Sequence, residues 1–153
     1  MSTVLKEAQK KQVLQNLGWG GVFDVTSDIT RGALGLYTMT YAAGTEGAEP
    51  HFHKKMIEIF NVLEGAMSVL INGEWRVVEA GGTVIIPTMT IHGFKPLEDR
   101  SCKIQILFTP NMKREEFFLD FHLYSNATDK EKYEFWAKYD QYPPQSHPDY
   151  KGE

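Results

Sequence analysis

Three histidines and one glutamate have the types and spacing of metal ligands. In an extended strand, side chains two residues apart leave the same face, so His51 and His53 can point the same way. Glu58 follows five residues later, a gap that suits a short reversal onto a neighbouring strand. His92 lies beyond a hairpin and a Gly-Gly turn, where a folded-over sheet could deliver it to the same place. The pattern predicts a metal site at His51, His53, Glu58 and His92.

This donor set suits a borderline divalent ion, and we predict one ion of Fe, Mn, Ni, Cu, Co or Zn. On a six-coordinate ion, four protein ligands leave positions open for water, dioxygen or two oxygens of a substrate. A four-coordinate zinc would have none unless Glu58 moved away, so the ligands alone leave the metal open. Glu58 is predicted as a ligand and also as the catalytic residue, a base toward the substrate.

Rigid strands must hold these side chains in place. Runs rich in β-branched and aromatic residues, separated by turn residues, predict about nine short strands and a sandwich or closed barrel. Glu64-Gly65 predicts a tight turn, and Asn72-Gly73 predicts a two-residue hairpin. We expect strands at residues 22–25, 35–42, 57–63, 67–71, 75–78, 83–86, 91–95 and 103–108.

The length and composition predict one folded domain. A chain of 153 residues with a hydrophobic fraction of 42% can bury one core, so we expect a single domain over 1–153. The barrel core should span about 22–109. In front of it, residues 3–17 carry a partial apolar stripe that ends at glycines, which predicts an N-terminal helix.

The C-terminal segment, 110–153, has a different character. A short helix is expected at 114–119, and Thr128 with Glu131 forms a capping box for a second helix. Residues 142–148 are rich in proline and predict an extended tail. Many aromatic side chains lie in this segment, and they must be buried either over the barrel mouth or against a second subunit.

The first histidine motif resembles that of the cupin family. The family's first motif has the form His-x-His, three or four residues, Glu, six residues, Gly. His51, His53, Glu58 and Gly65 fit this form with the four-residue gap.

The second family motif is Gly, five residues, Pro-x-Gly-x-x-His, three residues, Asn. Gly81, Pro87 and His92 fit, whereas Met89 stands where the family has glycine and Pro96 where it has asparagine. The glycine serves a tight turn, so we expect a differently shaped loop before His92. The resemblance covers about residues 35–108.

The resemblance implies a mostly β fold, a small antiparallel barrel of the double-stranded β-helix type that holds a metal ion. It also implies a homodimer, because similar single-domain cupins often dimerise. The expected activity is that of a metal-dependent dioxygenase acting on a small aromatic or polyphenolic compound, as in quercetinase-type cupins. The alternatives are a non-redox isomerase, cyclase or lyase, and a cupin that binds a small molecule without turnover.

Five further side chains are candidates for the lining of a substrate pocket. Phe60 and Val62 lie an even number of residues after Glu58, and Phe94 lies two residues after His92, so each pair should point to the same face of its strand. A neighbouring strand carries two more candidates. Ordinary barrel core is an equally good interpretation, because ligand pockets are mainly apolar. The candidate pocket residues are Met39, Tyr41, Phe60, Val62 and Phe94.

The charge pattern and hydropathy exclude some partners. The formal net charge of −4 is mild and no basic stripe is present, so nucleic acid is not expected as a partner. No apolar run reaches the length of a membrane span, and residues 1–7 lack the apolar run of a signal peptide. We therefore expect a cytoplasmic protein that acts on a small molecule.

Overall fold

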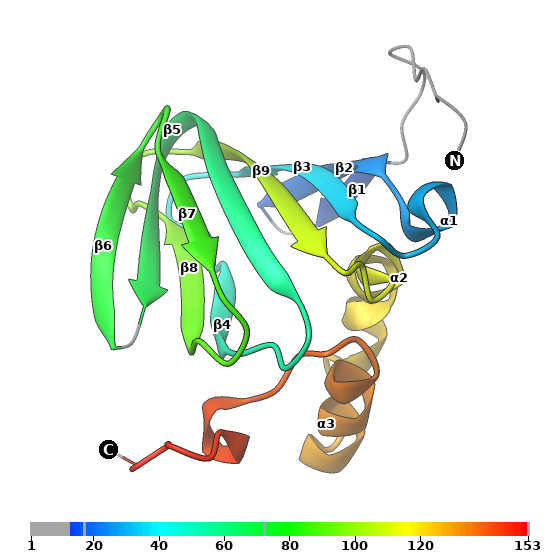
Figure 1. Ribbon diagram of the computed structural model, residues 1–153. Helices are drawn as coiled ribbons and strands as arrows, with labels where there is room; N and C mark the ends of the chain where they lie inside the picture. Colours follow the sequence, from blue (N-terminus) through cyan, green and yellow to red (C-terminus); the bar gives the residue numbers. More distant parts are fainter. Residues whose placement is uncertain (1–12, 17, 72, 153) are drawn as a thin grey trace.

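The computed structural model describes residues 13–16, 18–71 and 73–152 of the chain. In this part, nine antiparallel strands curl into a barrel-like sheet, with helices mainly in the C-terminal segment (Figure 1). The strands are β1 Val13–Asn16, β2 Trp19–Val25, β3 Gly35–Tyr41, β4 Ala48–His51, β5 Ile57–Ile71, β6 Glu74–Glu79, β7 Thr83–Ile86, β8 His92–Pro96 and β9 Cys102–Thr109. The helices are α1 Ser27–Thr30, α2 Arg114–Asp120 and α3 Asp129–Lys138, with single-turn 3-10 helices at Phe121–Tyr124 and Pro144–Ser146.

The long strand β5 joins the two halves of the sheet. Its first half pairs with β9 and β7, and its second half pairs with β6 and β8. The strand continues through Gly65, so the predicted tight turn at Glu64-Gly65 is wrong. Gly65 has a φ of 70°, and a Cβ there would lie 2.0 Å from the carbonyl oxygen of Ser101. Glycine thus permits a bend and a close backbone approach inside a continuous strand.

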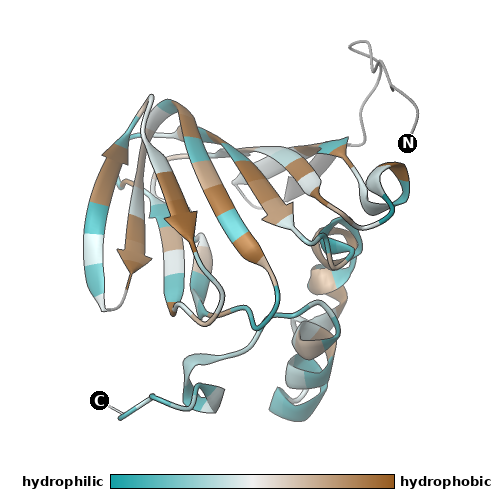
Figure 2. Ribbon diagram, in the orientation of Figure 1, coloured by the Kyte–Doolittle hydropathy of each residue, from teal (hydrophilic) through white to brown (hydrophobic). Residues whose placement is uncertain are grey.

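Alternating burial along the strands builds the barrel core. Every second residue of β9 is buried, including Ile104, Ile106 and Phe108 with no exposed surface. On β3, which pairs with β9, Tyr37 and Met39 are equally buried. Figure 2 shows hydrophobic residues concentrated on the strands, whereas the C-terminal tail is mostly hydrophilic. This period of two is the pattern that predicted strands here.

The turns after β5 follow the sequence prediction more closely. In the β5–β6 pair, Ile71 lies opposite Glu74, which leaves two residues for the connection. Gly73 in that connection has a φ of 86°, as a tight hairpin turn requires. The register therefore confirms the predicted two-residue hairpin, although Asn72 itself lies outside the described residues.

The predicted N-terminal helix is wrong where the structure tests it. Residues 13–16 form β1, which pairs with β2 so that Val13 lies opposite Val22. The apolar stripe of 3–17 was only partial, and pairing with an open sheet edge satisfies the backbone equally well. The remainder of the predicted helix, residues 3–12 and 17, lies outside the described residues.

The C-terminal segment contains the helices that the sequence predicts. The capping box is present, because the Thr128 hydroxyl accepts from the Glu131 N–H and the Glu131 carboxylate accepts from the Thr128 N–H. Phe135 is buried on α3, whereas Tyr133 on the same helix is 41% exposed. No helix in the described part is long and apolar enough to cross a membrane.

Candidate metal centre

Four side chains predicted as metal ligands meet at one end of the barrel. His51 ends β4 and His92 begins β8, and the two residues lie directly opposite each other in the sheet. Glu58 is the second residue of β5, and His53 lies in the connection between β4 and β5. All four are buried, with at most 3% of their surface exposed. Strand β4 lies outside the strand ranges expected from the sequence, so the ligands were predicted but one of the strands that carry them was not.

The ligand atoms of these four residues converge on a small volume. They all lie within 4.8 Å of one another. Glu58 Oε2 lies 2.8 Å from His92 Nε2 and 3.2 Å from His53 Nε2. Ligands that share one ion at roughly 2.0–2.2 Å lie at most about 4.4 Å apart. The cluster therefore has close to the span that a single ion requires.

Backbone carbonyls fix the orientation of all three imidazole rings. In each ring the Nδ1–H donates to one backbone carbonyl oxygen. The Nδ1-to-oxygen distances are 2.7 Å for His51 and Glu49, 2.6 Å for His53 and Asp140, and 2.8 Å for His92 and Thr90. A neutral imidazole protonated at Nδ1 presents a lone pair at Nε2. Lone pairs that face the Glu58 carboxylate repel it unless a cation lies between them. The donor set thus fits a divalent metal ion, with the carbonyls in the supporting role common around metal-bound histidines.

The pKa shifts support the same protonation states. Burial lowers the pKa of His51 well below its ordinary 6.5, and the neighbouring His92 and His53 lower it further. Burial also lowers the pKa of His53, although its contact with Glu58 acts in the opposite direction. Burial alone would raise the pKa of Glu58, but its close contacts with the His53 and His92 rings act in the opposite direction and hold it well below 4.5. Neutral imidazoles beside an ionised carboxylate are the forms that bind a metal.

A residue from the C-terminal segment holds the loop that carries His53. The Asp140 carboxylate accepts hydrogen bonds from the backbone N–H groups of Lys54, Lys55 and Met56, at 3.2, 2.8 and 2.9 Å. Its backbone oxygen accepts from His53, as described above. Asp140 has a φ of 59°, a left-handed conformation that aspartate tolerates better than most residues. This contact could not be predicted from the sequence, because no local period or motif links Asp140 to the histidines.

The loop before His92 keeps a left-handed residue at the position of the family's glycine. Met89 has a φ of 62°, a backbone conformation that glycine adopts more readily than a residue with a Cβ, and the expectation of a differently shaped loop stays a prediction. The Met89 N–H donates to the His53 carbonyl oxygen over 2.7 Å. Its own carbonyl accepts from His147 Nε2 over 2.8 Å. These contacts at both peptide groups stabilise a conformation that costs free energy in a residue with a Cβ.

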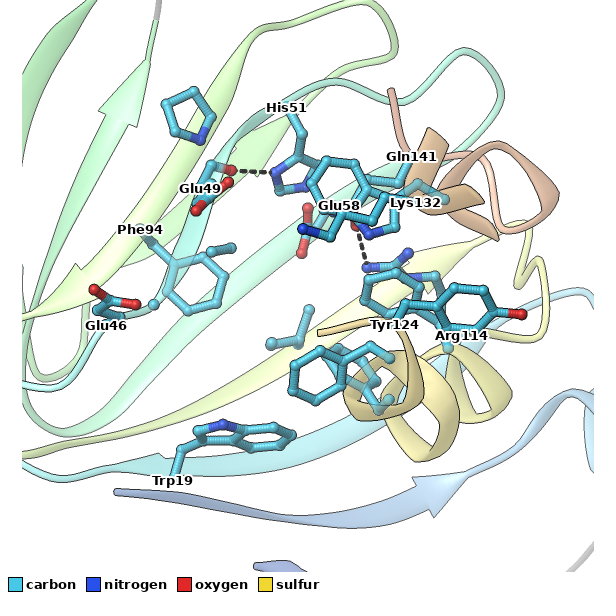
Figure 3. Close-up of a pocket in the computed structure, with 18 of the residues that line it drawn as sticks. Trp19, Glu46, Glu49, His51, Glu58, Phe94, Arg114, Tyr124, Lys132 and Gln141 are labelled. Atoms are coloured by element: carbon cyan, nitrogen blue, oxygen red, sulfur yellow. Dashed lines mark hydrogen bonds between the residues drawn. The ribbon is translucent and has the colours of Figure 1, made fainter. Parts of the chain in front are cut away.

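A cavity of about 370 Å³ opens beside the cluster, and His51 and Glu58 lie in its wall (Figure 3). Tyr41 and Phe94 also line it. The other three candidates, Met39, Phe60 and Val62, are absent from the cavity wall and pack in the barrel core, to which Tyr41 and Phe94 also belong. The alternation of side chains along a strand predicts which of them point into the barrel, but not how deep each one lies. Phe94, for example, packs edge-on against Phe60 with 5.1 Å between ring centroids.

Aromatic residues of the C-terminal segment form much of the remaining wall. The cavity is lined from this side by Phe117, Phe118, Phe121, Tyr124 and Trp136, and from β2 by Trp19. Of the two expected locations for these rings, the described structure places this group over the barrel mouth. In Figure 1 the tail continues beneath β4 and β8, where Phe52 and Tyr142 form a two-way backbone bridge.

Two polar residues of this cavity wall were not predicted from the sequence. Arg114, the first residue of α2, lines the cavity and is only 3% exposed. Gln141, near the start of the tail, accepts a hydrogen bond from the Arg114 guanidinium over 2.9 Å (Figure 3). A single arginine in a helical run of mixed charges carries no motif, so only the fold reveals its position.

Comparison with known families identifies the strand-rich part. The family described as "Cupin domain" matches residues 37–109. Residues 37–109 are a cupin domain. The matched range holds all four candidate metal ligands and ends at β9, so Arg114, Asp140 and the aromatic wall of the C-terminal segment lie outside it. A search among curated proteins finds no sequence that matches the chain.

Solved structures confirm the cupin fold. KdgF from Halomonas sp. matches with a TM-score of 0.61 at 22% identity, over 71% of this chain and 94% of its own. The polyketide cyclase RemF from Streptomyces resistomycificus matches at 0.58 and 20% identity, over 69% and 80%. A sugar phosphate isomerase of the cupin superfamily from Silicibacter pomeroyi matches at 0.53 and 18%, over 60% and 59%. At these identities the likeness establishes the fold, and the predicted mostly β cupin barrel is confirmed.

Proposed function

We propose that this cupin binds one divalent transition-metal ion through His51, His53, Glu58 and His92 and uses it as a Lewis acid. The reaction would be a non-redox isomerisation, cyclisation or elimination of a small molecule held in the adjoining cavity. The observation that carries the proposal is the orientation of the three rings. Their Nδ1 atoms are all engaged by backbone carbonyls, so that every Nε2 is free to face the Glu58 carboxylate.

A bound ion would polarise a carbonyl or hydroxyl oxygen of the substrate. Glu58 suits the role of ligand better than that of base, because its lowered pKa makes the carboxylate a weak proton acceptor near neutral pH. Tyr41 lines the cavity, and burial raises the pKa of its phenol, so the hydroxyl keeps its proton. The Tyr41 hydroxyl makes no hydrogen bond to any described residue and could donate one to a substrate oxygen.

The non-redox reaction is preferred to the predicted dioxygenase for one reason. Among the similar folds, the activities named are those of an isomerase and a cyclase, and neither is a dioxygenase. At 18% and 20% identity these proteins share the fold alone, so they decide which reaction class is tested first. The dioxygenase stays a prediction, since the same four ligands could hold a redox-active ion and the aromatic wall suits a planar substrate.

Metal binding is tested first, by elemental analysis and by competition with a chelator. We expect one equivalent of metal in the wild type and none in His92→Ala. The exposed His122 lies outside the cluster, so His122→Ala is a matched control that should keep its metal. Equal metal content in all three proteins would remove the basis of the proposal.

The reaction class is tested on protein loaded separately with Zn(II), Mn(II), Ni(II) and Fe(II). Isomerases, cyclases and many lyases remove a proton next to a carbonyl. We therefore expect metal-dependent exchange of such protons with deuterium, followed by NMR, in a panel of 2-oxo acids and hydroxyketones. Exchange supported by zinc, which has no redox chemistry, would favour the Lewis-acid reaction. Oxygen consumption with a flavonol, confined to redox-active ions, would favour the dioxygenase instead.

The oligomeric state is a separate proposal. A homodimer is expected from the family resemblance alone, and light scattering coupled to size-exclusion chromatography measures the mass directly.

A further inference from the structure

Arg114 is a buried cation in the wall of the cavity that adjoins the candidate metal centre. Its guanidinium carbon lies 4.0 Å from the ring centroid of Phe117, 5.0 Å from that of Phe108 and 5.4 Å from that of Phe118. These rings hold the guanidinium in place through cation–π contacts. A charged group with only 3% of its surface exposed is unusual unless a partner neutralises it.

The protein supplies Arg114 with few hydrogen-bond partners. Nη2 donates to Gln141 Oε1 over 2.9 Å, and Nη1 makes a long contact of 3.5 Å to the Tyr139 carbonyl oxygen. Nε has no partner among the described residues. Within that same part of the chain, no carboxylate lies within 4.0 Å of the guanidinium. Since a guanidinium has five N–H groups, most of its donor capacity is unused.

The charge balance of the cavity points to an anionic ligand. Burial lowers the pKa of Arg114 to about 10, and the charge of Glu58 is the largest effect that opposes this shift. Glu58 is also the carboxylate that a metal ion would take. With a divalent ion in place, the neutral imidazoles and one carboxylate leave a net positive charge, to which Arg114 adds a second. The acidic residues that line the cavity besides Glu58 are Glu46 and Glu49, and both are exposed.

We propose that Arg114 binds the carboxylate of the substrate, whose other end presents an oxygen to the metal centre. The ligand class is thus a small carboxylate with an apolar body that fits the aromatic wall. A guanidinium matches a carboxylate in charge and in the geometry of its donors. The single charge of the Arg114 guanidinium balances one carboxylate, whereas a phosphate at the same end could carry two negative charges against this one cation. The second half of this proposal, the oxygen at the metal, rests on the function proposed above.

Binding can be measured without knowing the natural substrate. The probe is 3-phenylpropanoate, compared with its neutral analogue 3-phenylpropanamide and with 2-phenylethylphosphonate. Trp19 and Trp136 line the cavity, so their fluorescence reports on occupancy, and calorimetry supplies an independent Kd. We expect the carboxylate to bind at least tenfold more tightly than the amide. Equal affinities would overturn the proposal, and tighter binding of the phosphonate would overturn the assignment to a carboxylate.

Two variants assign the preference to Arg114. Arg114→Gln should lose at least tenfold in affinity for 3-phenylpropanoate and little for the amide. Arg114→Lys keeps the charge and should retain part of the preference. Lys132, a partly exposed cation that lines the same cavity, is the matched control, and Lys132→Gln should stay within about twofold of the wild type. A loss in Lys132→Gln equal to that in Arg114→Gln would show a general charge effect and would overturn the assignment.

Each measurement is made on metal-free and on zinc-loaded protein, which separates the two proposals. A carboxylate preference that depends on Arg114 in metal-free protein supports the anion site even if the metal proposal fails. A preference that appears only with zinc and survives Arg114→Gln would place the carboxylate on the metal and overturn the anion site. If the Arg114 variants do not fold, a crystal of the wild type soaked with 3-(4-bromophenyl)propanoate decides. The bromine signal fixes the direction of the probe, and a carboxylate away from Arg114 would refute the proposal.

Discussion

Replacing Asp140 by alanine should both destabilise the fold and weaken metal binding. The carboxylate accepts three backbone N–H groups in the loop that follows His53, and the Asp140 carbonyl oxygen accepts from the His53 ring. Only 2% of the surface of Asp140 is exposed. The variant therefore removes the acceptor that fixes this loop, while leaving all four candidate ligands in the sequence.

The size of the effect follows from these contacts. Met56 is fully buried, so its unpaired N–H should cost about 1–3 kcal/mol. Lys54 and Lys55 are exposed and their N–H groups can turn to water, which limits the loss to about 0.5 kcal/mol each. Alanine at a φ of 59° adds about 1 kcal/mol of backbone strain. We expect a total loss of about 3–5 kcal/mol in the free energy of unfolding and a roughly 10- to 100-fold weaker affinity for metal.

Urea denaturation of the metal-free protein measures the first quantity, and competition with a chelator measures the second. Asp140→Asn keeps one acceptor oxygen and the tolerance for a left-handed backbone, so it should lose about half as much stability. Asp149, an exposed carboxylate in the same C-terminal segment, is the matched control, and Asp149→Ala should change neither quantity. Unchanged stability in Asp140→Ala, together with unchanged metal affinity, would refute the reasoning that this residue supports the site.

Three further predictions concern single features of the fold. Because burial lowers the pKa of His51 and of His53 below 6.5, the unfolded chain takes up protons first as the pH falls through that value. The free energy of unfolding of metal-free protein should therefore drop by up to about 1.4 kcal/mol per pH unit for each histidine, and urea titrations with no loss between pH 7.5 and 5.5 would contradict this. Gly65→Ala should cost about 3 kcal/mol or prevent folding, whereas Gly73→Ala, also at positive φ but with open space around it, should cost only about 1 kcal/mol by thermal unfolding. Met89→Gly should raise the stability by up to about 1 kcal/mol, and a decrease in urea denaturation would mean that the Met89 side chain stabilises its loop.

The candidate ligands could be predicted from the sequence because their signals are local. His51 and His53 share a face through the period of the strand, Glu58 follows five residues later, and His92 ends a short motif that begins at Gly81. The Asn72-Gly73 hairpin is equally local, since the backbone preference of the turn residues determines it. Each of these inferences needed only a few neighbouring residues.

The missed features depend on contacts between distant residues. Gly65 has the same sequence signal whether the chain reverses there or bends within one strand, and the close approach of Ser101 decides between the two. Residues 13–16 belong to a partial helical stripe, but the open edge of β2 was available for strand pairing. Asp140 lies 87 residues from His53 and Arg114 has no motif, so neither could be assigned to the site before the fold was known.

The division of the site between two parts of the chain bears on how its specificity is determined. The cupin domain, residues 37–109, supplies every candidate metal ligand. The segment after residue 109 supplies the carbonyl that orients His53, the aromatic wall and Arg114. On the function proposed above, metal chemistry would be held constant in the barrel while changes in the C-terminal segment would alter the charge and shape of the cavity. Because Asp140 ties that segment to the loop of His53, the two parts are coupled, and an ion bound in the barrel would also stabilise the wall that lines the cavity.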